Sequence, residues 1–376
     1  MHKLSLGVLV FSLLFLTGCS LAPPKIGQPA ANTEESNAFQ ASALPGAIWR
    51  SADGGKTFEP KIYVDEKRRI TKADVLDISF LMRDPEGKTQ ITRAPSVFIA
   101  TVDNGIFRSD DAGEVWQVKE FPPKKVYRFT ADSVNPERMF ATGVIANRGK
   151  IFRTKDGGQT WEDVYTEPGT GTVLTSLVQA PRSPETIFAG TSTGTVVRSL
   201  DSGETWKNIG TNIDGPITEM VFDAAVPNRL YALAFEKKVY RSDDNGLTWI
   251  DPLQAGSSAS SATPTGMIAL IADPSLPGTL YLGTRSAGFF RSQDDGATWE
   301  KLNIIESAEQ FPIRAFAVNP RNSDEIIFAA GRTFYKSINK GDTWAVVPLN
   351  TDRDISVMAY DPFDPSILYL GLRSFK

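Results

Sequence analysis

An octapeptide of the form Ser/Thr-x-Asp-x-Gly-x-Thr-Trp occurs seven times in this chain, with small departures. The copies begin at Ser51, Ser109, Thr154, Ser199, Ser242, Ser292 and Ser337. Successive copies start 43 to 58 residues apart. A period of this length is typical of repeat architectures, in which each repeat buries its apolar faces against its neighbours. The repeat therefore constrains the fold more than any other feature of the sequence.

The residues of the octapeptide are those of a tight turn between two strands. The acidic side chain can accept hydrogen bonds from nearby backbone N–H groups, and the glycine can adopt backbone angles that other residues resist. The final tryptophan buries a large ring. We expect structural roles for Asp53, Asp111, Asp156, Asp201, Asp244, Asp294 and Asn339, and for Trp116, Trp161, Trp206, Trp249, Trp299 and Trp344. A calcium loop would need alternating ligands and a distal Glu, so no metal is expected.

A second pattern precedes each later octapeptide. It consists of an apolar strand, an Asp-Pro, Asn-Pro or similar turn, and a second strand. Examples are 217–223 followed by 229–235, and 314–319 followed by 325–330. Each unit thus supplies four strands, called A to D here, with the octapeptide between C and D. Four short strands in each period of 40–50 residues predict an all-β fold, a β-propeller.

The two ends of the repeat region complement one another. Residues 47–50, before the first octapeptide, supply a C strand without A or B. Residues 355–361 and 367–372, after the last octapeptide, supply A and B strands without C or D. We expect the C-terminal A and B strands to pair with the N-terminal C and D strands. This pairing gives seven four-stranded antiparallel blades in a ring without free edges.

The N-terminal segment has the pattern of a secretion signal. Lys3 supplies positive charge, residues 4–16 are almost wholly apolar, and Leu16-Thr17-Gly18 precedes Cys19. A run this short is typical of a signal peptide rather than of a membrane-spanning helix. A cysteine directly after Leu-x-Gly resembles the bacterial lipoprotein signal, in which the cysteine is lipidated and becomes the new N-terminus. The alternative is an ordinary secreted protein with a chance cysteine.

These patterns divide the chain into three parts. We expect a lipoprotein signal peptide over 1–18, a lipidated Cys19 with a flexible tether over 19–45, and the propeller over 46–376. The tether is rich in Ala, Pro, Asn and Ser, a composition that disfavours a packed core. The resemblance to lipoproteins implies a lipid anchor in a bacterial membrane. The propeller would then face outside the cytoplasm, in the periplasm or at the cell surface.

The composition excludes several kinds of catalytic and metal-binding site. The one histidine is His2, inside the expected signal, and the one cysteine is the expected lipidation site. Nucleophile systems and zinc sites that need His or Cys are therefore excluded from the mature chain, as is an internal disulfide. A formal net charge of −4 does not favour nucleic acid as a partner. We expect no catalytic residue and no cofactor.

The octapeptide resembles the Asp-box, also called the bacterial neuraminidase repeat, over about residues 46–376. Proteins with this repeat include sialidases, xyloglucanases, sortilin-type receptor domains and a photosystem II stability/assembly factor-like family. The last is most similar in format, because its members are seven-bladed, non-enzymatic and, in cyanobacteria, lipoproteins. This resemblance implies a non-catalytic scaffold. The sialidase Arg-Ile-Pro motif is absent, since 311–314 reads Phe-Pro-Ile-Arg, so no catalytic residue carries over.

Basic residues gather in two adjacent D–A connections. They are Lys67, Arg68, Arg69 and Lys72 in the first, and Lys124, Lys125 and Arg128 in the second. We expect the D–A and B–C connections at the face opposite the octapeptides, where propellers usually bind ligands. Such a patch would attract an acidic surface, and it resembles in kind the arginine-rich surface of the assembly-factor relatives. The alternative is that these side chains merely keep the loops solvated.

We therefore expect a monomeric, membrane-anchored scaffold that binds a protein or assembles a complex. Its partner would be a membrane or envelope protein with an acidic surface. The alternative is a carbohydrate-active protein, either a lectin or a glycosidase with two carboxylates roughly 5–9 Å apart across a cleft. A third possibility is a purely structural role in the cell envelope. A flat basic surface, as against a cleft lined by carboxylates and aromatic rings, would distinguish the first two.

Overall fold

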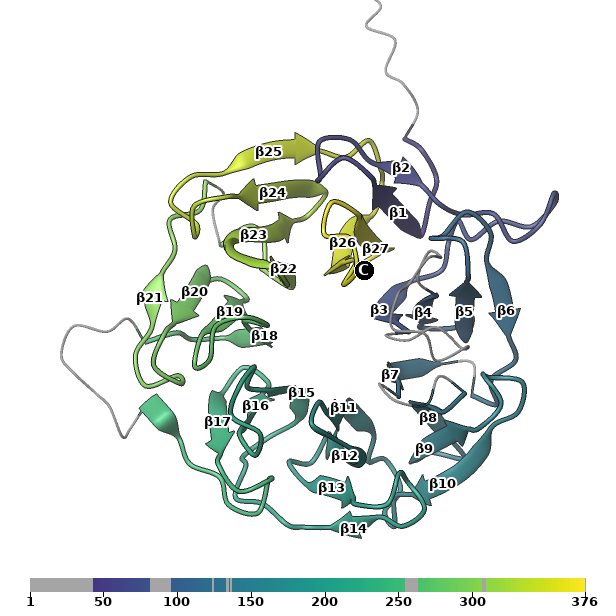
Figure 1. Ribbon diagram of the computed structural model, residues 1–376, viewed down its shortest axis with the longest axis vertical. Helices are drawn as coiled ribbons and strands as arrows, with labels where there is room; N and C mark the ends of the chain where they lie inside the picture. Colours follow the sequence, from purple (N-terminus) through teal and green to yellow (C-terminus); the bar gives the residue numbers. More distant parts are fainter. Residues whose placement is uncertain are drawn as a thin grey trace, which may run out of the picture. The chain divides into compact units, whose positions relative to one another are not determined.

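The computed structural model describes residues 43–81, 96–123, 125–132, 135, 137–253, 263–305 and 309–375. The predicted signal, Cys19 and the predicted tether up to residue 42 lie outside these residues. Within the unit Ser42–Lys376, seven sheets surround a common axis as the blades of a β-propeller (Figure 1). In this described part of the chain, no helix is long and apolar enough to cross a membrane.

Each blade has its first strand at the axis and its last strand at the rim (Figure 1). From axis to rim, one blade consists of β3 (Val75–Phe80), β4 (Val97–Thr101), β5 (Ile106–Ser109) and β6 (Gln117–Lys119). The second consists of β7 (Val126–Ala131), β8 (Met139–Ile145), β9 (Arg148–Thr154) and β10 (Glu162–Thr166). The third consists of β11 (Leu174–Ala180), β12 (Ser183–Thr191), β13 (Val196–Ser199) and β14 (Lys207–Asn208). The fourth blade consists of β15 (Ile217–Phe222), β16 (Leu230–Ala234) and β17 (Lys238–Ser242). The fifth consists of β18 (Met267–Ala272), β19 (Leu280–Thr284), β20 (Phe289–Ser292) and β21 (Glu300–Lys301). The sixth consists of β22 (Ala315–Asn319), β23 (Asn322–Ala330), β24 (Thr333–Ser337) and β25 (Ala345–Pro348).

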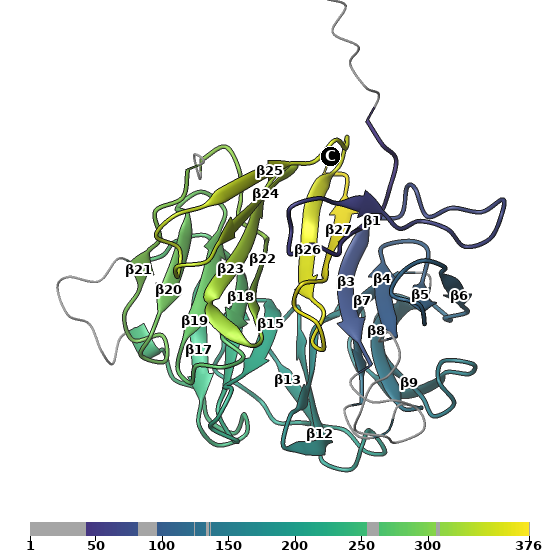
Figure 2. The same cartoon turned by 45° about the horizontal axis from the view of Figure 1, so that its top comes forward.

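The seventh blade closes the ring as the two ends of the repeat region predict. Its sheet order is β2-β1-β27-β26, with β1 (Ile48–Ser51), β2 (Glu59–Pro60), β26 (Asp354–Tyr360) and β27 (Leu368–Arg373). Ile48 pairs with Gly371, and Ser51 pairs with Leu368. Figure 2 shows β26 and β27 beside β1. The predicted seven-bladed fold and its closure are therefore confirmed.

The blade of β15–β17 differs from the others at its rim. Instead of a regular fourth strand, Ile250 forms a single bridge with Arg241. Pro252 follows two residues later and has no N–H to donate. In the next blade the corresponding Leu302 donates its N–H to the Phe289 carbonyl at 2.8 Å. The proline therefore ends the outer strand of this blade.

The hydrophobic core lies between neighbouring blades. Every residue of β4, β16 and β19 is buried, because each of these second strands has a strand on both sides and a blade on both faces. The side chains of Trp116 and Tyr369, from neighbouring blades, belong to one buried cluster. Burial of such apolar surface is the main contribution to the stability of the ring.

The octapeptides all fold into the same turn. In the third copy the Thr154 hydroxyl accepts from the Gly158 N–H at 2.9 Å and donates to Asp156 at 2.7 Å. Asp156 accepts in turn from the N–H and the hydroxyl of Thr160, at 2.9 and 2.6 Å. The octapeptide glycines all have φ between 78° and 93°, a region that residues with a Cβ rarely adopt. The structural role predicted for the acidic position thus consists of hydrogen bonds that hold the turn.

The residue before each glycine connects the turn to its surroundings. In the fourth copy, the Ser202 N–H donates at 2.8 Å to the carbonyl of Glu185, near the start of β12 and just after the A–B turn. The Ser202 carbonyl accepts from Arg153 of the preceding blade at 2.9 Å. At the ring closure, Lys336 donates to the Gly54 carbonyl at 2.9 Å. The octapeptides and the A–B turns therefore share one end of the ring, called the octapeptide end below.

The D–A and B–C connections meet at the other end of the ring, called the opposite end below. The Val102 N–H, after β4, donates to the Asp74 carbonyl, before β3, at 2.9 Å. The Phe235 N–H, after β16, donates to the Pro216 carbonyl, before β15, at 2.8 Å. This arrangement agrees with the placement predicted for these connections.

Candidate functional site

The basic residues of the first D–A connection lie on an exposed hairpin, which Figure 2 shows projecting from the ring between β2 and β3. Tyr63 and Arg69 form an isolated antiparallel bridge, and the Arg69 guanidinium lies 5.1 Å from the centre of the Tyr63 ring. Asp65 accepts from Arg68 Nε at 2.6 Å, and this hydrogen bond lowers the pKa of Asp65. The charge of Arg68 is thus partly neutralised. Lys67 and Arg69 form no ion pair with another described residue.

The second D–A connection is divided. Lys125 is exposed, and its ammonium lies 4.8 Å from the centre of the Tyr127 ring. Lys72, at the end of the first connection, is also exposed. Lys124 lies outside the described residues. Lys67, Arg68, Arg69, Lys72 and Lys125 are therefore solvent-facing, whereas Arg128 is part of β7 and points elsewhere.

Arg128 lies at the ring axis with two carboxylates. Its guanidinium forms an ion pair with Glu219 of β15 and donates to the Thr218 carbonyl at 2.9 Å. Asp77 of β3 accepts the N–H of Phe129 at 3.2 Å. Burial raises the pKa of Asp77 and of Glu219 against the attraction of Arg128. Burial acts to lower the pKa of Arg128, but Glu219 and Asp77 raise it overall.

These three charged residues occupy the same position in their strands. The pairing register of the inner strand shifts directly before Asp77, Arg128 and Glu219. A bulge of this kind turns the following side chain to a new direction. The same shift precedes small or apolar residues in three other inner strands, namely Ser176, Ala269 and Val357. One repeated backbone feature thus determines which side chains line the axis.

Two adjoining cavities lie between the inner strands, with volumes of about 180 and 220 Å³. They share Arg128, Glu219 and Arg314 among their lining residues. The first is lined by β3, β7, β15, β18, β22 and β26, and the second extends to Arg285 and Phe375 at the opposite end. Together they form a central channel that holds the Arg128–Glu219 ion pair inside and further arginines toward its mouth.

Three arginines surround that mouth. Arg285 follows β19, Arg314 precedes β22 and Arg373 ends β27. The guanidinium carbons of Arg314 and Arg373 lie 4.7 and 5.2 Å from the centre of the Phe375 ring. Burial lowers the pKa of Arg314, and repulsion by Arg285 and Arg373 adds to this, while Asp354 opposes it. We call Arg285, Arg314, Arg373 and Phe375 the arginine mouth.

The charge of the arginine mouth is only partly compensated. Arg285 forms an ion pair with Glu236. Arg314 and Arg373 have no ion-pair partner in the described part of the chain, and there the buried Nε of Arg373 also lacks an acceptor. Two other basic residues near this mouth are matched, in the pairs Arg353–Asp74 and Lys237–Asp214. Positive charge therefore remains at the channel mouth.

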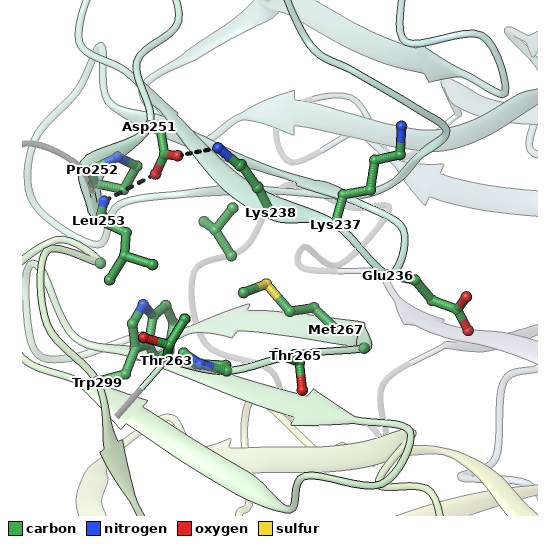
Figure 3. A pocket seen from close by; sticks show the side chains of 14 residues that line it. Glu236, Lys237, Lys238, Asp251, Pro252, Leu253, Thr263, Thr265, Met267 and Trp299 are labelled. Atoms are coloured by element: carbon green, nitrogen blue, oxygen red, sulfur yellow. Dashed lines mark hydrogen bonds and ion pairs between the residues drawn. The ribbon is translucent and has the colours of Figure 1, made fainter. Parts of the chain in front are cut away.

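A third cavity, of about 230 Å³, lies between the blades of β15–β17 and β18–β21 (Figure 3). Its walls include the buried side chains of Met267 and Trp299. At its rim Lys238 forms an ion pair with Asp251 at 2.7 Å, whereas Lys237 points away from the cavity (Figure 3). The apolar walls and the Lys238–Asp251 ion pair favour a gap between packed blades rather than a site with reactive side chains.

The channel offers limited means for catalysis. Among the described residues, no group of three or more His, Cys, Asp or Glu could hold a metal ion. The two channel carboxylates, Asp77 and Glu219, both interact with Arg128. The described channel lining contains no tryptophan or tyrosine on which a sugar ring could stack. The strongest feature of the opposite end is therefore its positive charge.

Sequence reasoning missed Asp77, Glu219 and the arginine mouth. The first two could have been found from the repeat, because they share one position relative to the start of their inner strands. The arginine mouth has no such signal. Its arginines follow one strand, precede another and end a third, in three different blades, and the closed ring brings them together.

No protein-family profile matches the sequence, and neither does any curated protein. Solved structures do match. The GH74 xyloglucanase from Xanthomonas campestris is 18% identical with a TM-score of 0.65, covering 87% of this chain and 52% of that one. YCF48 bound to a D1 peptide is 16% identical with a TM-score of 0.59, covering 81% and 93%. YCF48 from Cyanidioschyzon merolae is 15% identical with a TM-score of 0.57, covering 80% and 95%.

These identities establish a shared propeller fold and no more. The chain spans about half the length of the GH74 enzymes that it matches, whereas it spans nearly the whole of the YCF48 chains. The repeat predicts a similarity to propellers of the assembly-factor kind, and the structure shows this similarity in the fold.

Proposed function

We propose that this chain is a non-catalytic scaffold that binds an acidic segment of another protein at the opposite end of its propeller. The uncompensated positive charge of that end carries the proposal. It combines exposed Lys67, Arg69 and Lys125 with Arg314 and Arg373 of the arginine mouth. An excess of basic side chains on one end of an otherwise acidic protein attracts partners of the other sign and orients their approach.

The similarity to YCF48 supports this proposal. One of the matched structures is YCF48 bound to a D1 peptide, so a propeller of this kind can act as a peptide-binding protein. The present chain spans 93% of that structure, in contrast to about half of the GH74 enzymes. We further propose, from the sequence alone, that lipidation of Cys19 anchors the scaffold outside the cytoplasm. The partner would then be a membrane or envelope protein.

A carbohydrate-active function is the second candidate. Its support is the fold similarity to GH74 enzymes and the presence of Asp77 and Glu219 in one channel. A glycosidase needs one carboxyl group that donates a proton and one that acts as a base or nucleophile. Glu219 is instead held in an ion pair with Arg128, and the same guanidinium attracts Asp77. This candidate is therefore the weaker one.

Affinity capture from detergent-solubilised membranes of the host tests the proposal. The bait is the full chain, and the variant carries Arg69→Glu, Lys72→Glu and Lys125→Glu. We expect a stoichiometric membrane or envelope protein that the wild type retains and the variant loses, with equal melting temperatures of the two baits. Retention by both baits would contradict the proposed surface. Release of oligosaccharides from xyloglucan, with no protein retained, would favour the carbohydrate candidate.

A further inference from the structure

We propose that the arginine mouth is a carboxylate-binding site, in which Arg314 and Arg373 hold one carboxylate and Arg285 adds attraction. The inference rests on the proposed function, because it names the chemical group of a partner that the opposite end accepts. A carboxylate can come from an acidic side chain or terminus of a protein, or from a small free acid. The site takes the same group from either source.

Positive charge dominates the lining of the cavity. Four arginines line it, of which Arg128 pairs with Glu219 and Arg285 pairs with Glu236. Arg314 and Arg373 have no ion-pair partner among the described residues. Burial lowers the pKa of the Arg314 guanidinium, and repulsion by Arg285 and Arg373 acts in the same direction, while Asp354 opposes it. Like charges gathered without partners destabilise a fold, and they persist mainly at functional sites. An anion in the cavity would remove this repulsion.

Arg314 and Arg373 meet at one aromatic ring. Their guanidinium carbons lie 4.7 and 5.2 Å from the centre of the Phe375 ring. Neither guanidinium has an ion-pair partner among the described residues, so one anion could pair with both. The buried Nε of Arg373 has no acceptor among the described residues. A buried donor without an acceptor is costly, and a ligand oxygen would satisfy it.

The cavity is large enough for an acidic side chain. The cavity has a volume of about 220 Å³, against roughly 30 Å³ for one water molecule, so it can admit an acidic side chain. The planar fork of arginine matches both carboxylates and phosphates. Glu219 lines the same cavity, and Asp354 acts on Arg314. Charge alone does not separate the two anions, because the lining is net positive. We assign the site to carboxylates because the proposed partner is a protein, whose unmodified acidic groups are carboxylates.

The test is isothermal titration of the full chain with three probes: succinate, a tetraglutamate peptide and inorganic phosphate, all at equal ionic strength. The variants are Arg314→Met and Arg373→Met, which keep the apolar stem and remove the charge. The matched control is Arg182→Met, an exposed arginine at the octapeptide end. Melting temperatures of all proteins are measured in parallel.

We expect saturable binding of succinate or of the peptide, weakened about 10- to 100-fold by Arg314→Met or Arg373→Met, as for the loss of a charge-assisted hydrogen bond. Arg182→Met should bind like the wild type. The melting temperature of Arg314→Met should be unchanged or higher, because the substitution removes a repelled charge. Tighter binding of the peptide identifies a protein side chain as the source, and tighter binding of succinate identifies a small acid.

Two results would overturn the inference. One is the absence of saturable binding for both carboxylate probes, and the other is equal weakening by Arg182→Met. Phosphate binding as tight as that of the carboxylates would overturn the assignment to carboxylates. These outcomes are separable from the proposed function. A partner captured equally by the wild type and by Arg314→Met would refute the arginine mouth while leaving the scaffold role intact.

Discussion

The two ends of the ring are built by different rules. At the octapeptide end, each turn repeats the same hydrogen bonds, from Ser51 in the first copy to Ser337 in the last. At the opposite end, the connections differ in length and charge, from the hairpin at Arg69 to the arginine mouth. The octapeptide turns are thus held by hydrogen bonds within each turn, whereas the opposite end leaves positive charge for a partner. In a repeat protein of this kind, the repeated turns can provide stability while the variable connections bind a partner.

This difference predicts a large contrast between two aromatic substitutions. Trp116, beside the octapeptide turn, is fully buried and donates to the Lys61 carbonyl at 2.8 Å. Trp116→Ala should lower the free energy of unfolding by about 3–5 kcal/mol. Phe375, in the arginine mouth, is 40% exposed, and Phe375→Ala should cost below about 1 kcal/mol. Denaturant unfolding measures both, and similar costs would refute the division of roles.

Substitution of two glycines tests the same difference between the ends, with intermediate expected losses of stability. Gly203, in an octapeptide, has φ +80°, and an added Cβ would lie 2.5 Å from Phe140 Cε1. Gly171, in a D–A connection, has φ +82° with no atom within 4 Å of such a Cβ. Gly171→Ala should cost roughly 1–2 kcal/mol from backbone strain alone. Gly203→Ala should cost about 1–3 kcal/mol more, and an equal loss in thermal unfolding would count against this account.

The smallest effect concerns pH. Hydrogen bonds from Thr160 hold the pKa of Asp156 at about 2, below its unfolded value of about 4. A carboxylate with a lowered folded pKa stabilises the fold above about pH 4, and this contribution is lost as the pH falls through about 2. Asp156→Asn should therefore cost under about 1 kcal/mol at pH 7, and this cost should shrink as the pH falls toward 2 and below.

The last octapeptide provides the reverse substitution. Asn339 already accepts the Thr343 N–H at 3.0 Å, and its amide donates to the Thr343 hydroxyl at 2.9 Å. Asn339→Asp should slightly raise stability at pH 7 and should add acid sensitivity below about pH 4. Thermal unfolding between pH 2 and pH 7 checks both variants. Identical pH profiles for Asp156→Asn and the wild type would show that this hydrogen-bonded turn contributes no pH dependence.

The sequence predicted the fold because the fold consists of repeats. Seven copies of one turn determine the number of blades, and the strands left over at 47–50 and 355–372 determine the closure. The irregular rim of the β15–β17 blade was not predicted. Its cause is local, because Pro252 removes a donor that Leu302 supplies in the next blade. The repeat predicts the features that all blades share. A feature of one blade alone can be predicted only from the residue that causes it.

The candidate site could be predicted only in part. Exposed Lys67, Arg69 and Lys125 were identified from charge within neighbouring loops. Arg128 was grouped with them, but a register shift in β7 directs it to the axis, where it meets Glu219. Such a bulge changes the direction of a side chain without a distinctive residue type. The arginine mouth was missed because its members come together only when the ring closes.

The most direct test of the central claim compares equal charge changes at the two ends. One variant of the full chain carries Arg69→Glu, Lys72→Glu and Lys125→Glu at the opposite end. The other carries Lys56→Glu, Arg182→Glu and Lys340→Glu at the octapeptide end. The account predicts that quantitative capture of an acidic partner is lost in the first variant and retained in the second. Equal loss in both variants, or loss in the second alone, would contradict it.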